Sequence, residues 1–150
     1  MEENILQLYG VRPTAVRLLI WRQIVKTDHP FSLSDMEVWL DTVDKSTLFR
    51  ALTLFEEHHL LHSIDDGSGQ KKYCRCDDTD ACLTHTHEHE HEHEHEHIGC
   101  KHVHAYCTRC QRTFCIRTEQ IPLVKMPEGF EVTDINYVVR GICPECQKKK

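Results

Sequence analysis

The sequence has no long apolar run and no beginning typical of an exported protein. No stretch approaches the roughly 18 consecutive apolar residues that a membrane-spanning helix requires. The first ten residues, MEENILQLYG, contain neither the basic segment nor the apolar segment of a secretory signal. We therefore expect a cytoplasmic protein that does not enter a membrane.

Each half of the 150-residue chain also has too little apolar sequence to bury a large core by itself. Small domains of this kind are usually reinforced by metal, disulfides or oligomerisation. The odd number of cysteines, nine, two Cys-x-x-Cys pairs and the missing signal segment argue against a disulfide framework. With thirteen histidines in the same chain, the cysteines favour metal binding.

An excess of positive charge, common in nucleic-acid-binding proteins, is absent as well. The net charge is −6, but residues 77–99 hold eight acidic residues and no Lys or Arg, so the remainder carries +2. Residues 1–76 contain nine basic and eleven acidic side chains. Charge alone therefore does not predict DNA binding, and a few well-placed Arg and Lys would have to contact the phosphates.

The first part of the chain has the pattern of three helices followed by a hairpin. Apolar residues recur at helical spacing over three stretches, 13–27, 34–43 and about 46–58. Ser34 is the expected N-cap of the second helix, and Asp44 or Ser46 that of the third. Two strands, 60–64 and 70–74, flank an Asp-Asp-Gly-Ser-Gly turn signal. This order is that of a winged helix, whose third helix enters the major groove while the wing lies on the DNA backbone; a small α+β domain of another kind fits the same pattern.

The rest of the chain divides into a low-complexity stretch and a second small unit. Residues 77–99 contain the run HTHEHEHEHEHEH at 85–97, which has almost nothing to bury and predicts an exposed linker or loop. The last part predicts strands and one helix, at 102–106, 113–116, 118–125 (the helix) and 131–140. The fold class is therefore α+β, with a winged-helix domain over 1–76, a His/Glu-rich insertion or linker over 77–99 and a small α/β domain over 100–150.

Two Cys-x-x-Cys motifs are the strongest local signal, Cys107 with Cys110 and Cys143 with Cys146. Two such motifs place four thiolates at the corners of a tetrahedron about 2.3 Å from a zinc ion. A zinc ion with no open coordination position stabilises a fold rather than catalyses a reaction. A redox dithiol or a chance pairing is the alternative interpretation.

A second set of metal donors lies near the junction of the two domains. In a hairpin centred on Ser68, His62 lies opposite Cys74, and the two can share one metal ion. His102 and His104 alternate along the next strand, so both imidazoles point the same way. This His3Cys set suits Zn2+ better than a hard ion, and its further possible donors are His29 and Cys115. Taken one at a time, each is equally well explained as a solvated His or a small buried Cys. Three further cysteines have no assigned role, Cys76, Cys82 and Cys100.

These motifs together resemble the ferric uptake regulator superfamily over nearly the whole chain except 77–99. The string Gly10-Val11-Arg12-Pro13-Thr14, followed by Arg17, is similar to the start of that family's first DNA-binding helix. Residues 44–52 (DKSTLFRAL) are similar to its recognition helix, with Phe49 where a Tyr usually stands before Arg50. The run from His102 to Cys110 (HVHAYCTRC) is the family's most specific string, and the last Cys-x-x-Cys completes the zinc site of its zinc-containing members.

The resemblance implies a homodimer that binds a palindromic double-stranded DNA operator when a regulatory metal closes its two domains. It makes residues 100–150 a dimerisation domain stapled by zinc. The residues it assigns to DNA binding are Arg12, Thr14, Arg17, Lys45, Thr47, Phe49 and Arg50.

Within that superfamily, the pairing of His62 with Cys74 is similar to zinc uptake regulators. Cys74 and Cys115 stand where iron sensors often have carboxylates, and thiolate-rich donors favour Zn2+ over Fe2+. We therefore expect a zinc-loaded transcriptional repressor of metal-uptake genes. The alternatives are an iron-, haem- or peroxide-responsive regulator of the same family, and a metal storage or delivery protein that uses the His/Glu run. An enzyme is not expected, because the HExxH spacing appears only inside the low-complexity His/Glu run and not on a predicted helix.

Overall fold

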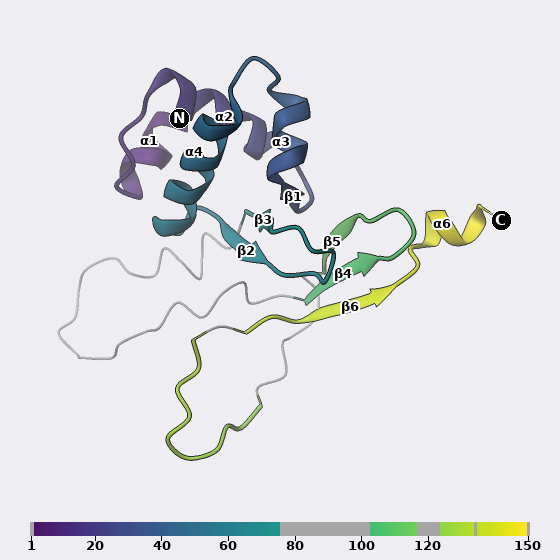
Figure 1. Ribbon diagram of the computed structural model, residues 1–150. Helices are drawn as coiled ribbons and strands as arrows, with labels where there is room; N and C mark the ends of the chain where they lie inside the picture. Colours follow the sequence, from purple (N-terminus) through teal and green to yellow (C-terminus); the bar gives the residue numbers. More distant parts are fainter. Residues whose placement is uncertain (1, 76–102, 117–123, 134, 150) are drawn as a thin grey trace.

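The computed structural model describes residues 2–75, 103–116, 124–133 and 135–149. Helices α1 to α4 gather at one end of the molecule, two small sheets follow beneath them, and α6 lies beyond the second sheet (Figure 1). The helices of the first part are α1 (Glu2–Leu8), α2 (Ala15–Lys26), α3 (Leu33–Trp39) and α4 (Lys45–Glu57). The chain thus has the predicted architecture, a winged helix joined to a small α/β unit.

Side-chain caps set where the helices begin. The Thr14 hydroxyl accepts a hydrogen bond from the Arg17 amide at the start of α2, and the Asp44 carboxylate accepts one from Thr47 at the start of α4. For α3 the cap is Ser32, which forms a capping box with Asp35. The prediction of Ser34 as this N-cap was wrong, because Ser32 reaches the Asp35 amide while the Asp35 side chain returns to the Ser32 amide.

Helix α1 was not predicted from the sequence. It has seven residues, and of its side chains only Leu6 is buried, so it carries too few apolar positions to show a helical period. Its C-terminal end is held by His58, the residue that follows α4, whose Nδ1 lies 2.8 Å from the Tyr9 carbonyl oxygen. Gly10 follows with φ of 77°, a left-handed conformation that suits glycine after a helix.

One apolar core joins the four helices to the first sheet. Trp21 packs edge-on against Phe55 with ring centroids 5.7 Å apart, and Phe31 stacks on Tyr73 at 5.9 Å. The fully buried aliphatic members are Leu6, Ile20, Ile24, Met36, Leu48 and Leu52. The apolar residues that recur at helical spacing in the third predicted helix, Leu48, Ala51, Leu52 and Phe55, therefore face the core, and the opposite side of α4 is exposed.

The first sheet has the strand order β1-β3-β2 and includes the wing. Its strands are β1 (Phe31–Ser32), β2 (His62–Ile64) and β3 (Lys72–Cys74), which run antiparallel. The register pairs His62 with Cys74, as predicted from the hairpin. Both wing strands have three residues, shorter than expected, and all three residues of β3 are buried.

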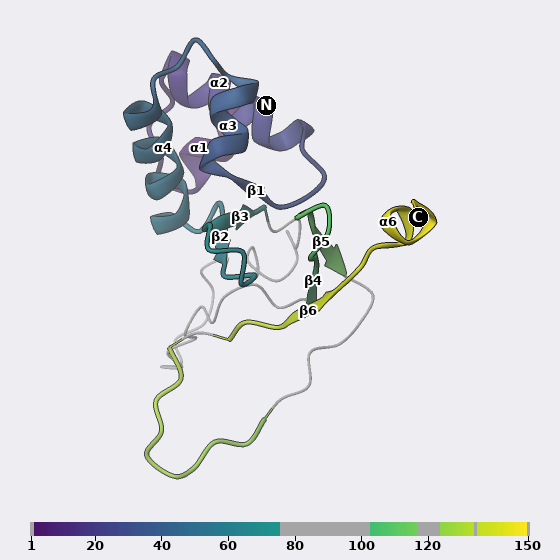
Figure 2. The same ribbon diagram turned by 45° about the vertical axis from the view of Figure 1, so that its right-hand side comes forward.

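The second sheet has the order β5-β4-β6 and leads into a short helix (Figure 2). Its elements are β4 (Val103–Cys107), β5 (Thr113–Ile116), β6 (Val138–Gly141) and α6 (Pro144–Lys148). The predicted strand 131–140 was too long: β6 begins at Val138, and its four residues pair in parallel with His104–Cys107 of β4. Most of the predicted helix 118–125 lies outside the described residues; Val124 and Lys125, which are described, are not helical.

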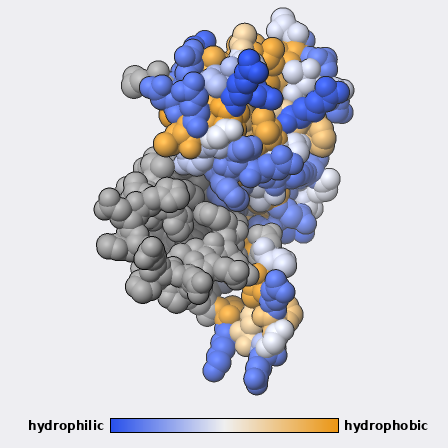
Figure 3. Space-filling view, turned by 90° about the vertical axis from the view of Figure 1, so that its left-hand side faces the viewer, coloured by the Kyte–Doolittle hydropathy of each residue, from blue (hydrophilic) through white to orange (hydrophobic). Residues whose placement is uncertain are grey.

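Figure 3 shows hydrophilic side chains interspersed with hydrophobic ones over the helices on one face of the molecule. Within the described ranges, none of the helices has the length and apolar character needed to cross a membrane.

Candidate metal centres and nucleic-acid interface

The four cysteines of the two Cys-x-x-Cys motifs converge at one end of the second sheet. Cys107 ends β4, Cys110 follows in a turn, Cys143 precedes α6 and Cys146 lies in it. Their sulfurs all lie within 4.8 Å of one another, and those of Cys110 and Cys143 are 3.8 Å apart. Four Zn–S bonds of about 2.3 Å in a tetrahedron require sulfur separations of about 3.8 Å. The cluster can therefore hold a metal ion such as zinc.

Backbone amides stabilise the thiolate form of one cysteine in this cluster. The amides of Cys143 and Cys110 donate to the Cys107 sulfur at 3.3 and 3.5 Å, and these bonds lower the pKa of Cys107 to about 6. Contacts with the other thiols, first that of Cys143, and burial raise the pKa of Cys146 to about 12. Because neighbouring thiols without a cation resist sharing negative charge, the donor set fits a divalent metal that compensates it.

A second cluster joins the wing to the second sheet. Cys74 comes from β3, His104 from β4 and Cys115 from β5, and their ligand atoms all lie within 4.8 Å of one another. His104 and Cys115 are opposite each other in the β4–β5 register, and the sulfurs of Cys74 and Cys115 are 3.1 Å apart. The structure thus brings three of the six predicted donors together.

The remaining predicted donors lie at different places. His29 lines a hollow of about 220 Å³ that Cys74 and Cys115 also line, and its Nδ1 is 2.9 Å from the Asp28 carboxylate. His62 pairs with Cys74 in the wing but is not a member of the three-residue group. His102 lies outside the described residues, as do Cys76, Cys82, Cys100 and the His/Glu run. Among the described residues, His29 is therefore the next donor that shares a cavity with both thiols.

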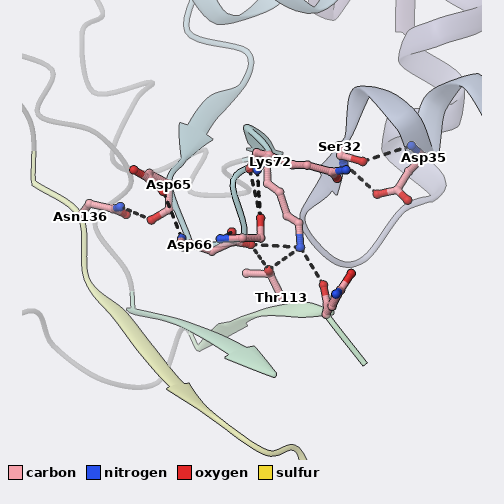
Figure 4. Close-up of polar contacts among 11 residues, drawn as sticks. Ser32, Asp35, Asp65, Asp66, Lys72, Thr113 and Asn136 are labelled. Carbon is pink, nitrogen blue, oxygen red and sulfur yellow. Dashed lines mark hydrogen bonds and ion pairs between the residues drawn. The ribbon is translucent and has the colours of Figure 1, made fainter. Parts of the chain in front are cut away.

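A buried polar network fastens the wing to the same sheet (Figure 4). The Lys72 ammonium donates to Thr113 Oγ1 and to the Gln111 carbonyl, both at 2.9 Å, and pairs with the Asp66 carboxylate at 3.0 Å. Thr113 Oγ1 in turn donates to Asp66. The Asp66 side chain is 0% exposed and that of Lys72 8%, and the ammonium lies 5.2 Å from the Tyr106 ring centroid. We call Asp66, Lys72 and Thr113 the wing latch.

The tip of the wing also faces the second sheet. The Asn136 side chain donates to the Asp65 carbonyl at 2.6 Å (Figure 4). At Gly67, an added Cβ would lie 3.3 Å from Arg140 Cζ. Asp65 and Gly67, on one side of the turn, thus contact the second sheet, whereas Gly69, Gln70 and Lys71 are exposed.

The exposed side of α4 and the start of α2 border one groove. Its volume is about 390 Å³, and five of the seven residues predicted for DNA binding line it, namely Thr14, Arg17, Thr47, Phe49 and Arg50. Phe49 is 52% exposed, an unusual position for an aromatic ring. Arg12 and Lys45 are exposed nearby in sequence but are not part of the lining. Arg17 Nη1 donates to the Arg12 carbonyl at 2.9 Å, which fixes the turn before α2.

Comparison with known proteins places this arrangement in a known fold. No family model matches the chain. A ferric uptake regulation protein of Synechococcus elongatus is 22% identical over 97% of this chain and 82% of its own length. A solved structure of the Pseudomonas aeruginosa ferric uptake regulator with manganese matches with a TM-score of 0.60 and 18% identity, covering 96% of this chain and 98% of that one. A zinc uptake regulator solved with zinc and DNA has the same TM-score and identity, covering 98% and 91%.

This chain has the ferric uptake regulator fold. The resemblance predicted from the sequence motifs is thereby confirmed. What the motifs did not reveal in this ferric uptake regulator fold is the wing latch. One signal was present: side chains alternate along a strand, so Lys72 shares a face with Cys74 and lies across from Ile64, a buried apolar residue. A lysine on such a face requires a buried partner.

Proposed function

We propose that this protein is a metal-responsive transcriptional repressor, a homodimer that binds operator DNA when zinc occupies the cluster at the junction of its two domains. The observation that carries the proposal is the group Cys74, His104 and Cys115, because its donors come from both the wing and the second sheet. An ion held there contacts two bodies at once. Any metal that binds this arrangement more tightly than other arrangements shifts the population toward it.

The four-cysteine cluster is proposed as a structural zinc site. Its four thiols leave no coordination position for a substrate or water. Zinc bound by Cys107, Cys110, Cys143 and Cys146 ties the end of β4 to α6. This site is the staple of the dimerisation domain over 100–150, and it is separate from the junction cluster that senses metal.

Zinc is the proposed regulatory ion because of the chemistry of the donors. Two thiols and one imidazole are a soft set, whereas iron sites without haem or sulfide more often use carboxylate and imidazole. His29 is the proposed fourth ligand, since it lines the hollow that both thiols share; His62 and His102 are the remaining candidates. Fe2+ or haem at this site would instead make the protein an iron, haem or peroxide sensor.

A second copy of the chain is the proposed occupant of an apolar surface on the second sheet. A hollow of about 360 Å³ runs over β4, β5 and β6 there. Phe114, Val139 and Ile142 border it and are 37%, 61% and 42% exposed.

The structure of a zinc uptake regulator with zinc and DNA supports the same overall function in a protein of this fold. For the His/Glu run at 85–97 we propose weak binding of several metal ions near the sensor, dispensable for folding.

The regulatory site can be tested with Cys74→Ser. Serine removes one thiolate but preserves side-chain size, so we expect the variant to lose one of two zinc ions per subunit and to keep the dimer. Zinc-dependent operator binding should weaken by about 5- to 150-fold, the usual range of coupling between two sites. Zinc content and mobility shift on the gene's own promoter, with and without Zn2+, Fe2+ or haem, provide the readouts.

Cys82→Ser, at a cysteine without an assigned role, is the matched control and should behave as the parent protein. If Cys74→Ser kept full zinc stoichiometry and a normal zinc response, Cys74 would not be a ligand. If DNA binding responded to Fe2+ or haem and not to Zn2+, the regulatory ligand would be Fe2+ or haem instead of zinc. Metal uptake by the parent protein with no effect on DNA binding would favour a storage or delivery protein.

The DNA-binding face can be tested with Arg50→Ala. Arg50 is exposed on α4 and lines the groove with Phe49, so its removal should weaken operator binding by about 1–3 kcal/mol without changing dimerisation. Arg22→Ala is the control, because Arg22 is also exposed but pairs with Glu2 at 2.7 Å and lies outside the groove. If both variants bound the operator with equal affinity at matched salt, a surface other than this groove would bind the DNA.

A further inference from the structure

We propose that Cys74 and Cys115 are an oxidisable thiol pair, which hydrogen peroxide or another small hydroperoxide converts into a disulfide between the wing and the second sheet. The disulfide would use the same two sulfurs that hold the regulatory metal. The consequence for metal sensing rests on the proposed function, whereas formation of the bond does not.

The first support is the position of the two sulfurs. They lie 3.1 Å apart, although the cysteines are 41 residues apart in sequence and belong to different sheets. Ile64 and Val138 pack around them in a small apolar cluster of their own. Because both strands are held in sheets and the wing latch fastens one sheet to the other, the two sulfurs remain close without a metal ion.

The second support is access from solvent. Both cysteines line the hollow of about 220 Å³ that His29 and Arg75 also border. A water molecule occupies about 30 Å³, so a molecule of hydrogen peroxide fits this space easily. Cys115 is half-buried and Cys74 is only 3% exposed, which makes Cys115 the sulfur that the oxidant reaches first.

The chemistry balances with one hydroperoxide for each pair. The Cys115 thiolate attacks one peroxide oxygen, the O–O bond breaks, and the other oxygen leaves as water after taking a proton. The resulting sulfenic acid is attacked at sulfur by the Cys74 thiolate, which forms the S–S bond and releases the second water. Two thiols are oxidised by two electrons in total, and the peroxide is reduced to two water molecules.

Oxidation and metal binding therefore exclude each other at this site. A disulfide sulfur is no longer a thiolate donor, which leaves His104 alone of the three-residue group. The regulatory zinc would be released, while the four-cysteine zinc site and the wing latch, which use other residues, stay in place. A metal-responsive regulator built this way would also report oxidants.

The test uses the full-length protein with zinc in the four-cysteine site and the regulatory metal removed by a weak chelator. One equivalent of hydrogen peroxide is added, free thiols are alkylated, and peptides from a non-reducing digest are mapped by mass spectrometry. We expect a Cys74–Cys115 linked peptide, loss of regulatory zinc binding, and recovery of both by dithiothreitol. Zinc loaded beforehand should slow the reaction.

Cys115→Ser should abolish the linked peptide, and Cys82→Ser should leave it unchanged. The proposal is overturned if peroxide links only the cysteines of the four-cysteine site, or if Cys115 passes to sulfinic acid while Cys74 remains alkylatable. These outcomes are independent of DNA binding. A linked peptide in a protein without zinc-dependent operator binding would refute the proposed function alone, and the reverse result would refute the thiol pair alone.

Discussion

Replacing Cys143 with Ser is expected to unfold the C-terminal unit and to leave monomer or aggregate in place of the dimer. Among the described residues after 102, few side chains are buried: His104, Tyr106, Cys107, Thr113 and Cys146. Two of these five are in the four-cysteine cluster, so little apolar burial remains to stabilise the unit. Zinc-binding free energies of about 10–16 kcal/mol at such sites are largely folding free energies.

Zinc analysis, circular dichroism and sedimentation would measure this effect, with Cys82→Ser as the matched control. The Cys143 variant should contain no structural zinc, and a chelator strong enough to strip the parent protein should reproduce its behaviour. A stable, zinc-free dimer from Cys143→Ser would show that the cluster is not the staple of this domain.

Lys72→Met is expected to lower the free energy of unfolding by about 3–5 kcal/mol, because it leaves the Asp66 carboxylate buried without its cation. Lys71→Met is the control at the next position: its ammonium pairs with Glu56 at 2.6 Å, but the Lys71 side chain is 53% exposed. Such surface pairs contribute about 0–1 kcal/mol. The double variant Asp66→Asn with Lys72→Met should recover part of the loss, since no uncompensated charge remains.

Urea unfolding at neutral pH would give these free energies. Equal values for the Lys72 and Lys71 variants would show that the wing latch does not stabilise the fold.

The pH dependence of the free energy of unfolding provides a second check. Burial alone would raise the pKa of Asp66, but hydrogen bonds from Ser68, Thr113 and Lys72 lower it from 3.8 to about 2. Because the pKa of Asp66 is lower in the folded protein than in the unfolded chain, its carboxylate stabilises the fold at pH values above the unfolded pKa. This stabilisation is lost as the pH falls from about 4 toward 2. Asp66→Asn should make the free energy of unfolding nearly independent of this group's titration between about pH 4 and 2.

The latch also bears on how a metal ion could act on this protein. None of the three latch residues is a ligand of either proposed metal site, so docking of the wing on the second sheet does not require the metal. A regulatory ion would then adjust a junction that is already assembled, rather than join two free domains. Its effect on DNA affinity is limited to its differential affinity for the two arrangements.

Local patterns in the sequence were enough to predict the winged helix and the four-cysteine cluster. Helical spacing placed the inner stripe of α4, a turn signal centred the hairpin and set the pairing of His62 with Cys74, and two Cys-x-x-Cys motifs identified all four members of the cluster. The helical stripe and each Cys-x-x-Cys motif depend on residues a few positions apart, and the hairpin pairs residues that are symmetric about its turn. That the two motifs meet was predicted from the four ligands that a structural zinc ion requires.

Contacts between distant segments were decided only by the tertiary structure. Cys115 entered the junction cluster because β5 pairs with β4, which places it opposite His104 and within 3.1 Å of Cys74. Lys72 is buried because the wing folds onto the second sheet and not onto solvent or DNA. Strand β6 has four residues, which pair with His104–Cys107 of β4. In each case one deciding partner is more than 30 residues away, namely Cys74 for Cys115, Thr113 for Lys72 and His104 for Val138, and no local period encodes such a distance.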